Sequence, residues 1–143
     1  MGIFQTSVTS EASSHPTVHI AILVDTQAVI ANHSISPTNV IYMVDDNGSG
    51  KLPSQGEGSY ELNTYCSPGD QISWKIFAVN GQDSIEFTWF KSSGNVFGDN
   101  PPSGVKTEYL ATVVSPGSEV YQVGIKIAGA VDYSWDPYIT SVS

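Results

Sequence analysis

Apolar and polar residues alternate along most of this chain with a period of two, which is the spacing of side chains along a β-strand. The clearest case is residues 17–25, where the apolar residues in alternate positions are Val18, Ile20, Ile22 and Val24. The residues between them are partly apolar too, which is typical of a strand inside a sandwich. By the same reasoning, further strands are predicted at residues 40–44, 60–64, 71–79, 84–91, 109–113, 121–127 and 139–142. The pattern therefore predicts a β-protein of about eight strands.

Glycine, proline and asparagine mark the turns between these segments. Asn80 and Gly81 favour a tight hairpin, so residues 71–79 and 84–91 are expected to pair. Residues 92–104 are rich in Gly, Ser, Asn and Pro and are expected to form a long exposed loop. Loops of this kind often carry functional residues, which makes this loop a candidate for a binding site.

One segment departs from the alternation. Residues 26–33 predict a short helix of about two turns, with Asp25 or Thr26 as its N-cap. Together with the regular strand spacing, this predicts an all-β protein with a β-sandwich, jelly-roll-like fold and one short helix. A flexible arm at residues 1–16 is expected to precede a single domain at residues 17–143.

Several residues of types that are often functional are predicted to be structural here. Trp74 and Trp89 are in phase with the apolar positions of their strands, so both are predicted to lie in the core. Asp25 is expected to accept hydrogen bonds from the free N–H groups at the start of the helix. Cys66, the single cysteine, lacks a neighbouring cation in the sequence and is predicted to be an inert thiol.

The composition excludes several classes of partner. The 143 residues include five Lys, no Arg and fourteen Asp plus Glu, for a formal net charge of −9 and an isoelectric point near 4.4. Five scattered cations do not make a footprint for nucleic acid or an anionic membrane, and no apolar run approaches the ~18 residues of a spanning helix. Without Arg, the usual bidentate clamp for phosphate is missing. Neutral, hydroxyl-rich or apolar ligands remain.

Candidate catalytic residues are scarce. The three histidines, His15, His19 and His33, lie in the first quarter of the chain and outside any recognisable catalytic motif. No spacing of Cys and His indicates zinc, and no Gly-rich fingerprint indicates a nucleotide. A glycosidase would need paired carboxylates brought together from distant strands. The protein is therefore predicted not to be an enzyme.

The turn that begins at Asp45 alternates oxygen-bearing side chains like the start of an EF-hand loop. Asp45, Asp46 and Asn47 are therefore candidate calcium ligands. The pattern fails at its twelfth position, which is Gly56, with Glu57 one residue late. A plain hairpin turn is one alternative, and calcium held by carboxylates of separate loops is another. Calcium is the one cofactor that the sequence leaves open.

Four segments carry motifs that occur together, in this order, in a known family: HIAILVDTQAVIANH, VIYMVDDNGSGKL, SPGDQISWKI and YSWDPYITSV. Their most specific pieces are residues 24–26, residues 41–44, Gly69 and Asp70 with Trp74, and residues 135–137. Over about residues 17–142 the chain resembles the AidA/PixA family of bacterial inclusion-body proteins. Members of that family form intracellular inclusions in host-associated bacteria and include lectins.

The resemblance implies carbohydrate binding, with a neutral saccharide or glycan as the partner. It also implies a location in cytoplasmic inclusions or release without a conventional signal peptide, because the opening residues MGIFQTSVTS lack the basic and apolar regions of such a peptide. The connection over residues 33–40 is shorter than in longer members of the family, so ligands from that loop are not carried over.

Neutral sugars are bound by aromatic faces that stack on C–H groups and by Asp and Asn side chains that bond hydroxyls. Two clusters supply these types: Tyr133, Trp135, Asp136 and Tyr138, and, in the predicted loop, Asn95, Phe97, Asp99 and Asn100. The structural alternatives are that Trp135 fills the sandwich, that Asp136 caps a turn, and that the loop is simply solvated.

Two interpretations of function follow. The first is a lectin-like homo-oligomer that binds neutral saccharides at the sandwich edge, because oligomers multiply weak sites through avidity. The alternative is a self-assembling inclusion or storage protein without catalytic activity. Such a protein would assemble as the pH falls towards 4.4 and the repulsion between copies is lost. An effector that binds a host protein is a third interpretation, which the sequence offers nothing to test.

Overall fold

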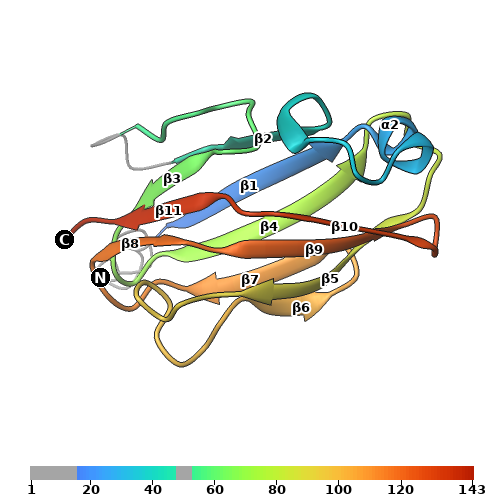
Figure 1. Cartoon of the computed structure of the whole chain (residues 1–143). Coiled ribbons are helices and arrows are strands. Elements are labelled where there is room, and N and C mark those ends of the chain that lie inside the picture. The colour runs from blue at the N-terminus through green and yellow to red at the C-terminus, as the bar shows by residue number, and fades with distance from the viewer. Residues whose placement is uncertain (1–15, 48–52) are drawn as a thin grey trace, which may run out of the picture.

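The alternating segments become strands in a computed structural model that describes residues 16–47 and 53–143. The described residues form eleven strands, one α-helix and one 3₁₀ turn, arranged as an all-β sandwich of two layers (Figure 1). The elements are β1 (Thr17–Val24), α2 (Thr26–Ala31), η1 (Pro37–Asn39), β2 (Ile41–Asp45), β3 (Asn63–Cys66), β4 (Gln71–Ala78), β5 (Ile85–Lys91), β6 (Ser103–Val105), β7 (Glu108–Thr112), β8 (Gly117–Val120), β9 (Gln122–Ile127), β10 (Val131–Trp135) and β11 (Tyr138–Ser141).

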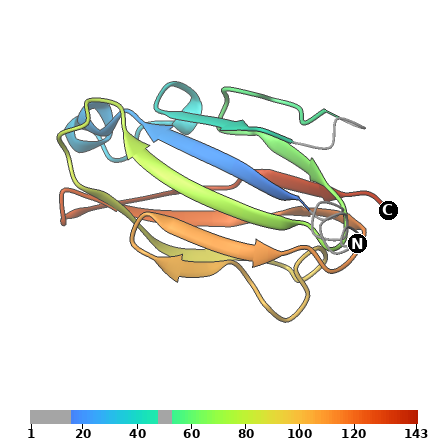
Figure 2. The ribbon, with the colours of Figure 1, turned by 180° about the vertical axis from the view of Figure 1, so that it is seen from behind.

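The first layer is a five-stranded sheet in the order β2-β1-β4-β7-β6. β1 pairs in parallel with β4 and antiparallel with β2, so it lies in the interior of the sheet. Alternation along these strands sends Ile20, Ile22 and Trp74 into the core, where each is at most 1% exposed. Figure 2 looks at the opposite, outer side of this layer, with β1, β4 and β7 in front.

The second layer consists of two three-stranded sheets, β10-β9-β5 and β3-β11-β8, which are joined end to end. β8 and β9 flank Tyr121, and β10 and β11 flank residues 136–137, so two long ribbons run through both sheets (Figure 1). At the joint, the backbone N–H of Tyr121 donates to the carbonyl of Pro137 at 3.0 Å. This bond links the two ribbons at the point where the hydrogen-bond ladders of the two sheets are interrupted.

Aromatic side chains fill the centre of the core. The ring of Trp74 makes edge-on contacts with Phe90, Phe97 and Tyr121, at centroid distances of 5.1, 5.8 and 5.7 Å. The indole Nε1 of Trp74 donates to the hydroxyl of Tyr121 at 3.0 Å, and neither residue is exposed to solvent. Because Trp74 belongs to β4 and Tyr121 to the joint of the second layer, this bond connects the two layers.

Helix α2 covers one end of the sandwich, as Figure 1 shows. The Asp25 carboxylate accepts from the backbone N–H of Ala28 at 3.2 Å, which confirms Asp25 as the N-cap. Asp83 accepts hydrogen bonds from the side chains of Thr26 and Gln27, and these bonds lower the pKa of the Asp83 carboxyl. The connection between β4 and β5 is thereby attached to the start of the helix.

The expected hairpin between residues 71–79 and 84–91 is wrong. β4 has β1 on one edge and β7 on the other, which leaves no edge for β5. β5 pairs with β9 in the other layer instead. The turn at Asn80 and Gly81 does form, with a φ of 72° at Gly81, but it carries the chain from one layer to the other.

Other elements also differ from the prediction. The strand expected at residues 60–64 begins at Asn63, and the residues before it form isolated bridges, one between Met43 and Ser59 and one between Gln55 and Asn63. Residues 131–135, which include Tyr133 and Trp135 of the predicted sugar cluster, form the edge strand β10. β6 and β8 lie outside the predicted strands as well.

Removing the hydroxyl that joins the layers should destabilise the fold. Tyr121→Phe leaves the buried indole N–H of Trp74 without an acceptor, so we expect the free energy of unfolding to fall by about 1–3 kcal/mol. Urea denaturation followed by tryptophan fluorescence measures this loss. Tyr138→Phe, which removes a hydroxyl from a half-exposed side chain, is the matched control and should change stability by less than about 0.5 kcal/mol. Equal losses in the two variants would contradict this role of the bond.

Candidate functional site

The first predicted sugar cluster is divided between the core and the surface. Tyr133 and Trp135 point inward from β10 and are buried. The hydroxyl of Tyr133 donates to the carbonyl of Ile35 at 2.7 Å, and desolvation raises the pKa of that phenol. The indole of Trp135 donates to the sulfur of Met43 at 3.3 Å. Trp135 therefore fills the sandwich, which is the structural alternative considered for it.

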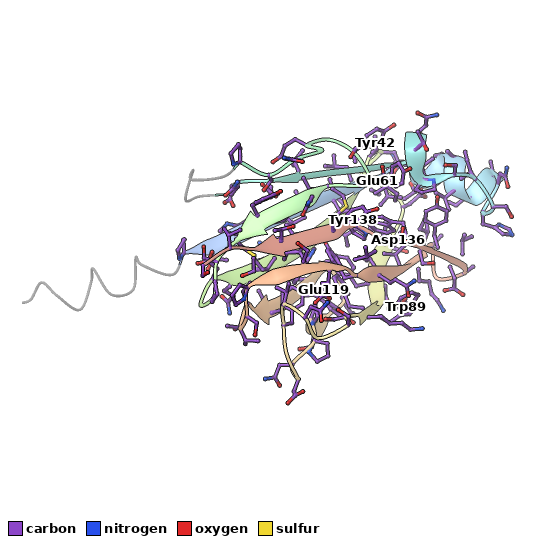
Figure 3. All side chains as sticks on the ribbon, turned by 60° about the vertical axis from the view of Figure 1, so that its left-hand side comes forward. Tyr42, Glu61, Trp89, Glu119, Asp136 and Tyr138 are labelled. Carbon is purple, nitrogen blue, oxygen red and sulfur yellow. The ribbon has the colours of Figure 1, made fainter. Side chains whose placement is uncertain are left out.

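Asp136 and Tyr138 lie outside the core, at the joint between β10 and β11 (Figure 3). Tyr138 and Asn95 line one groove of about 480 Å³, together with Ser118, Glu119 and Thr140. These two residues are the only members of the two predicted clusters that line it. Asp99 and Asn100 are exposed and do not line this groove.

The expected long exposed loop is anchored through a buried carboxylate. Glu119 accepts hydrogen bonds from the hydroxyl of Ser92 at 2.7 Å and from the backbone N–H groups of Ser93 and Val96 at 3.2 and 2.9 Å. Val96 and Phe97 are fully buried beneath it. The expectation of an exposed loop is therefore wrong for its first part, because apolar burial and the Glu119 carboxylate bind that part to the sandwich.

The predicted calcium ligands point in different directions. Asp45 turns towards the interior, where its carboxylate accepts from the Thr64 hydroxyl at 2.7 Å. Asp46 turns outward and bonds the imidazole of His19 at 2.7 Å. Asn47 follows with a φ of 21°, and residues 48–52 of the expected loop lie outside the described residues. Within residues 16–47 and 53–143, no three His, Cys, Asp or Glu side chains gather in a group suited to a metal ion.

Glu57 lies beside Asp45. Its side chain accepts from the backbone N–H of Asp45 at 2.9 Å. Burial raises the pKa of Glu57, and the neighbouring carboxylate of Asp45 raises it further. One oxygen of Asp45, Oδ1, is shielded from solvent and has no hydrogen-bond partner among the described residues. The sequence pattern did place an acidic residue here, but one position away from the EF-hand spacing.

The outer side of the five-stranded sheet carries a continuous apolar surface. Leu23 of β1 lies between its cross-strand partners Tyr42 and Phe77, and Ala21 lies beside Val44. All but Ala21 are large apolar side chains that are more than a third exposed. We call these five residues the apolar sheet face. The partly apolar second side of β1 was expected to be covered inside a sandwich, but the described residues place no second layer over it (Figure 2).

Charges around the apolar sheet face are few. Lys75 and Glu108 are cross-strand partners on this side of the sheet, and His19 bonds Asp46 at its border. Among the outward side chains of the five described strands and of the residue that follows β2, Asp46 and Glu108 are the only acids. The face is therefore close to neutral in a chain with a formal charge of −9.

Trp89 is a candidate that sequence reasoning missed. It was predicted to be a core residue, but a β-bulge between Phe87 and Trp89 shifts the register of β5 against β9. Trp89 therefore turns outward and is 37% exposed, whereas Phe87 and Phe90 remain packed in the core. Two signals pointed to this: the bulky Phe90 directly follows Trp89, and Gly124 stands opposite, where glycine often marks a bulge or a close approach.

A groove of about 360 Å³ lies beside Trp89, between β10 and the connection that follows α2. Its polar lining includes His33, Asp132 and Ser134, and Tyr133 closes one side. Figure 3 shows Trp89 well apart from Asp136 and Tyr138. The exposed indole therefore lies apart from Asp136 and Tyr138, and Tyr133 is the one member of the predicted sugar cluster that lines the groove beside it.

The sequence matches one family model, described as "Domain of unknown function (DUF8788)", over residues 16–132. No curated protein sequence matches the chain. Among the described residues, no helix has the length and apolar character needed to span a bilayer.

Two solved structures align with the fold. The crystal structure of the inclusion body protein PixA from Burkholderia cenocepacia J2315 aligns with a TM-score of 0.72 and 16% identity, over 90% of this chain and 96% of that one. The expected relation to PixA is thus confirmed for the fold. A laccase from Botrytis aclada aligns with a TM-score of 0.36 and 13% identity, over 90% of this chain and 29% of that one, and carries no argument.

Cys66 should not react in the folded protein. Burial raises the pKa of its thiol from 9.0 to about 12, and the thiol faces the carbonyl of Thr140 at 3.5 Å. We expect a thiol reagent to label Cys66 at the rate of unfolding and not at the rate of a free thiol. Labelling in increasing urea, with denatured protein as control, measures this. Because the folded pKa is the higher one, stability should also fall as the pH rises above about 9. Rapid labelling without denaturant would contradict the burial.

Proposed function

This chain belongs to the family described as "Domain of unknown function (DUF8788)", and we propose that it is a self-assembling protein of the inclusion-body type. Its copies associate through the apolar sheet face, and the resulting assembly is its function. The single observation that carries this proposal is the uncovered outer side of the five-stranded sheet. The fold shared with the inclusion body protein PixA supports the proposal without assigning the contact.

The apolar sheet face has the shape and chemistry of half an interface. Its exposed side chains project from hydrogen-bonded neighbouring strands, so they form one nearly flat surface. Sheets pack face to face at about 10 Å by interdigitating such side chains. Each 100 Å² of apolar surface removed from water contributes about 2.5 kcal/mol before the cost of association. A second copy of the chain offers the same surface.

The net charge of the chain favours a second copy of the chain as the partner that covers the apolar sheet face. Two molecules with a formal charge of −9 repel each other, and the repulsion is weakest where the contact surface is nearly neutral. Lys75 and Glu108 lie side by side at the edge of the apolar sheet face. A two-fold axis close to this pair would bring Lys75 of one copy near Glu108 of the other and make the contact complementary to itself.

A two-fold contact closes after two copies, so a larger assembly needs a second contact. β2 and β6 form the edges of the five-stranded sheet. The outer edge of β2 is covered, because the N–H of Met43 donates to the carbonyl of Ser59 and the carbonyl of Met43 accepts from the N–H of Gly58. β6 is the edge left for a strand from another chain, and exposed sheet edges readily add such strands. Growth along the β6 edge, combined with pairing of the apolar sheet faces, accounts for an inclusion.

Saccharide binding, the first interpretation of the sequence, stays a prediction. Of the residues named for it, Tyr133 and Trp135 serve the core, and only Asn95 and Tyr138 line a common groove. Calcium, homo-oligomeric avidity and the absence of catalysis likewise stay predictions. The geometry favours assembly because the apolar sheet face gathers four exposed apolar side chains on three neighbouring strands, whereas the predicted sugar residues are divided between the core and the surface.

Adding a negative charge to the apolar sheet face should prevent association. Phe77→Glu places a carboxylate within the proposed contact, and we expect self-association to weaken by about tenfold or more. Sedimentation velocity over a range of protein concentrations measures this, at pH 7 and near pH 4.4, where association of the unmodified chain should be strongest.

Val120→Glu is the matched control. Val120 is 48% exposed against 49% for Phe77, and it lies on β8 in the other layer. Both variants add the same charge, so only the position differs. We expect Val120→Glu to associate nearly as the unmodified chain does. Equal weakening in both variants would reduce the effect to net charge, and a monomeric unmodified chain under all conditions would overturn the proposal.

A further inference from the structure

The indole of Trp89 lies flat on bare backbone. A Cβ atom built on Gly124 would lie 2.2 Å from Cε2, 2.3 Å from Nε1 and 2.6 Å from Cδ2 of this indole. These three ring atoms are nearly equidistant from the Cβ position, so the face of the ring, and not its edge, covers Gly124. One face of the indole therefore rests on β9. The other face is turned away from the sheet, with the ammonium of Lys91 over the ring.

The position of this ring is fixed by the sheet. Trp89 and Gly124 are cross-strand partners next to the bulge, so the backbone on both sides is held by the ladder between β5 and β9. Any side chain at residue 124 would displace the indole. A rigid, exposed aromatic face placed on a strand loses little conformational entropy when a ligand stacks on it.

The groove beside the ring supplies hydrogen-bonding groups. Asp132 and Ser134 project from β10 on the side of the sheet that carries Trp89, since Ser134 and Trp89 are both partners of Gly124. His33 lines the groove from the connection after α2. A carboxylate accepts from alcohol groups, whereas a hydroxyl and a neutral imidazole can both donate to them and accept from them. The groove volume of about 360 Å³ is within the range of small-molecule sites.

We propose that Trp89 and this groove bind a neutral saccharide, with one pyranose ring stacked on the exposed face of the indole. The C–H groups of the ring meet the aromatic face, and its hydroxyls bond Asp132, Ser134 and His33. The indole Nε1–H, which bonds no acceptor among the described residues, gains a sugar oxygen as its partner. This site shares only Tyr133 with the clusters predicted from the sequence, and it lies on the layer opposite to the apolar sheet face.

The charges around Trp89 favour an uncharged ligand. The ammonium of Lys91 lies 5.3 Å from the centroid of the Trp89 ring, and Lys126 lies 3.9 Å from the Asp132 carboxylate. Glu86 is the cross-strand partner of Lys126. Two cations and two carboxylates therefore balance on this side of the sheet. The flexible Lys91 side chain lies over the ring, and a sugar that displaces it would leave its ammonium free to donate to a hydroxyl.

Indole resonances give a direct test. The chain has three tryptophans, and Trp74 and Trp135 donate to acceptors in the core, so three distinct Nε1–H signals are expected in a proton–nitrogen spectrum. Trp89→Phe identifies one of them by its loss. The methyl glycosides of glucose, galactose, mannose, fucose and N-acetylglucosamine are titrated to millimolar concentrations. We expect one or more of them to shift the Trp89 signal saturably and to leave the other two in place.

Variants separate this site from the alternatives. Trp89→Leu should weaken binding of that glycoside by about tenfold or more, because it removes the stacking face without touching the core. Asp132→Asn should weaken it less, and Tyr138→Ala, in the groove shared with Asn95, should leave it unchanged. The spectrum of each variant shows whether it is folded. No shift of the Trp89 signal with any glycoside would overturn the proposal, and so would binding that depends on Tyr138 and not on Trp89. Phe77→Glu changes only the apolar sheet face and should bind the sugar normally. The sugar-binding result therefore does not depend on whether the assembly proposal holds.

Discussion

The hydrogen bond between Trp74 and Tyr121 holds together the parts on which the rest of the fold depends. Trp74 comes from the middle strand of one layer, and Tyr121 comes from the joint at which the other layer changes from one sheet to the next. With both residues fully buried, the indole N–H and the phenol satisfy each other in a site that water does not reach. Phe90 and Phe97 pack around the pair, so the bulged strand β5 and the anchored loop are positioned against the same ring.

The sequence predicts where the strands of this protein lie better than it predicts which strands pair with each other. Alternation identifies β1 and β4 because side-chain direction depends only on the local backbone. It does not show that these two strands pair with each other in parallel, since the choice of partner depends on residues far along the chain. The turn at Asn80 and Gly81 illustrates this: its local chemistry forms, yet the following strand joins the opposite layer.

The candidate functional residues also divide into those whose role depends on neighbouring residues and those whose role depends on distant strands. Asp25 is recognisable as a cap from the few residues around it, and its role is confirmed. Trp89 is not, because the bulge that turns it outward depends on the strand opposite and on the absence of a side chain at Gly124. The apolar sheet face was visible as the second apolar side of β1, but whether another layer covers that side is a property of the whole topology.

The central position of β11 has a consequence for the route to the folded state. β11 lies between β3, its parallel partner, and β8, so this sheet cannot close before residues 63–141 are all available. β1 likewise waits for residues 71–78 of β4. Such non-local pairing slows folding, and a strand that is apolar on both sides stays accessible to other nascent chains in the meantime. How fast a cell synthesises this protein, relative to this closure, therefore decides whether copies meet as finished sandwiches or as open chains.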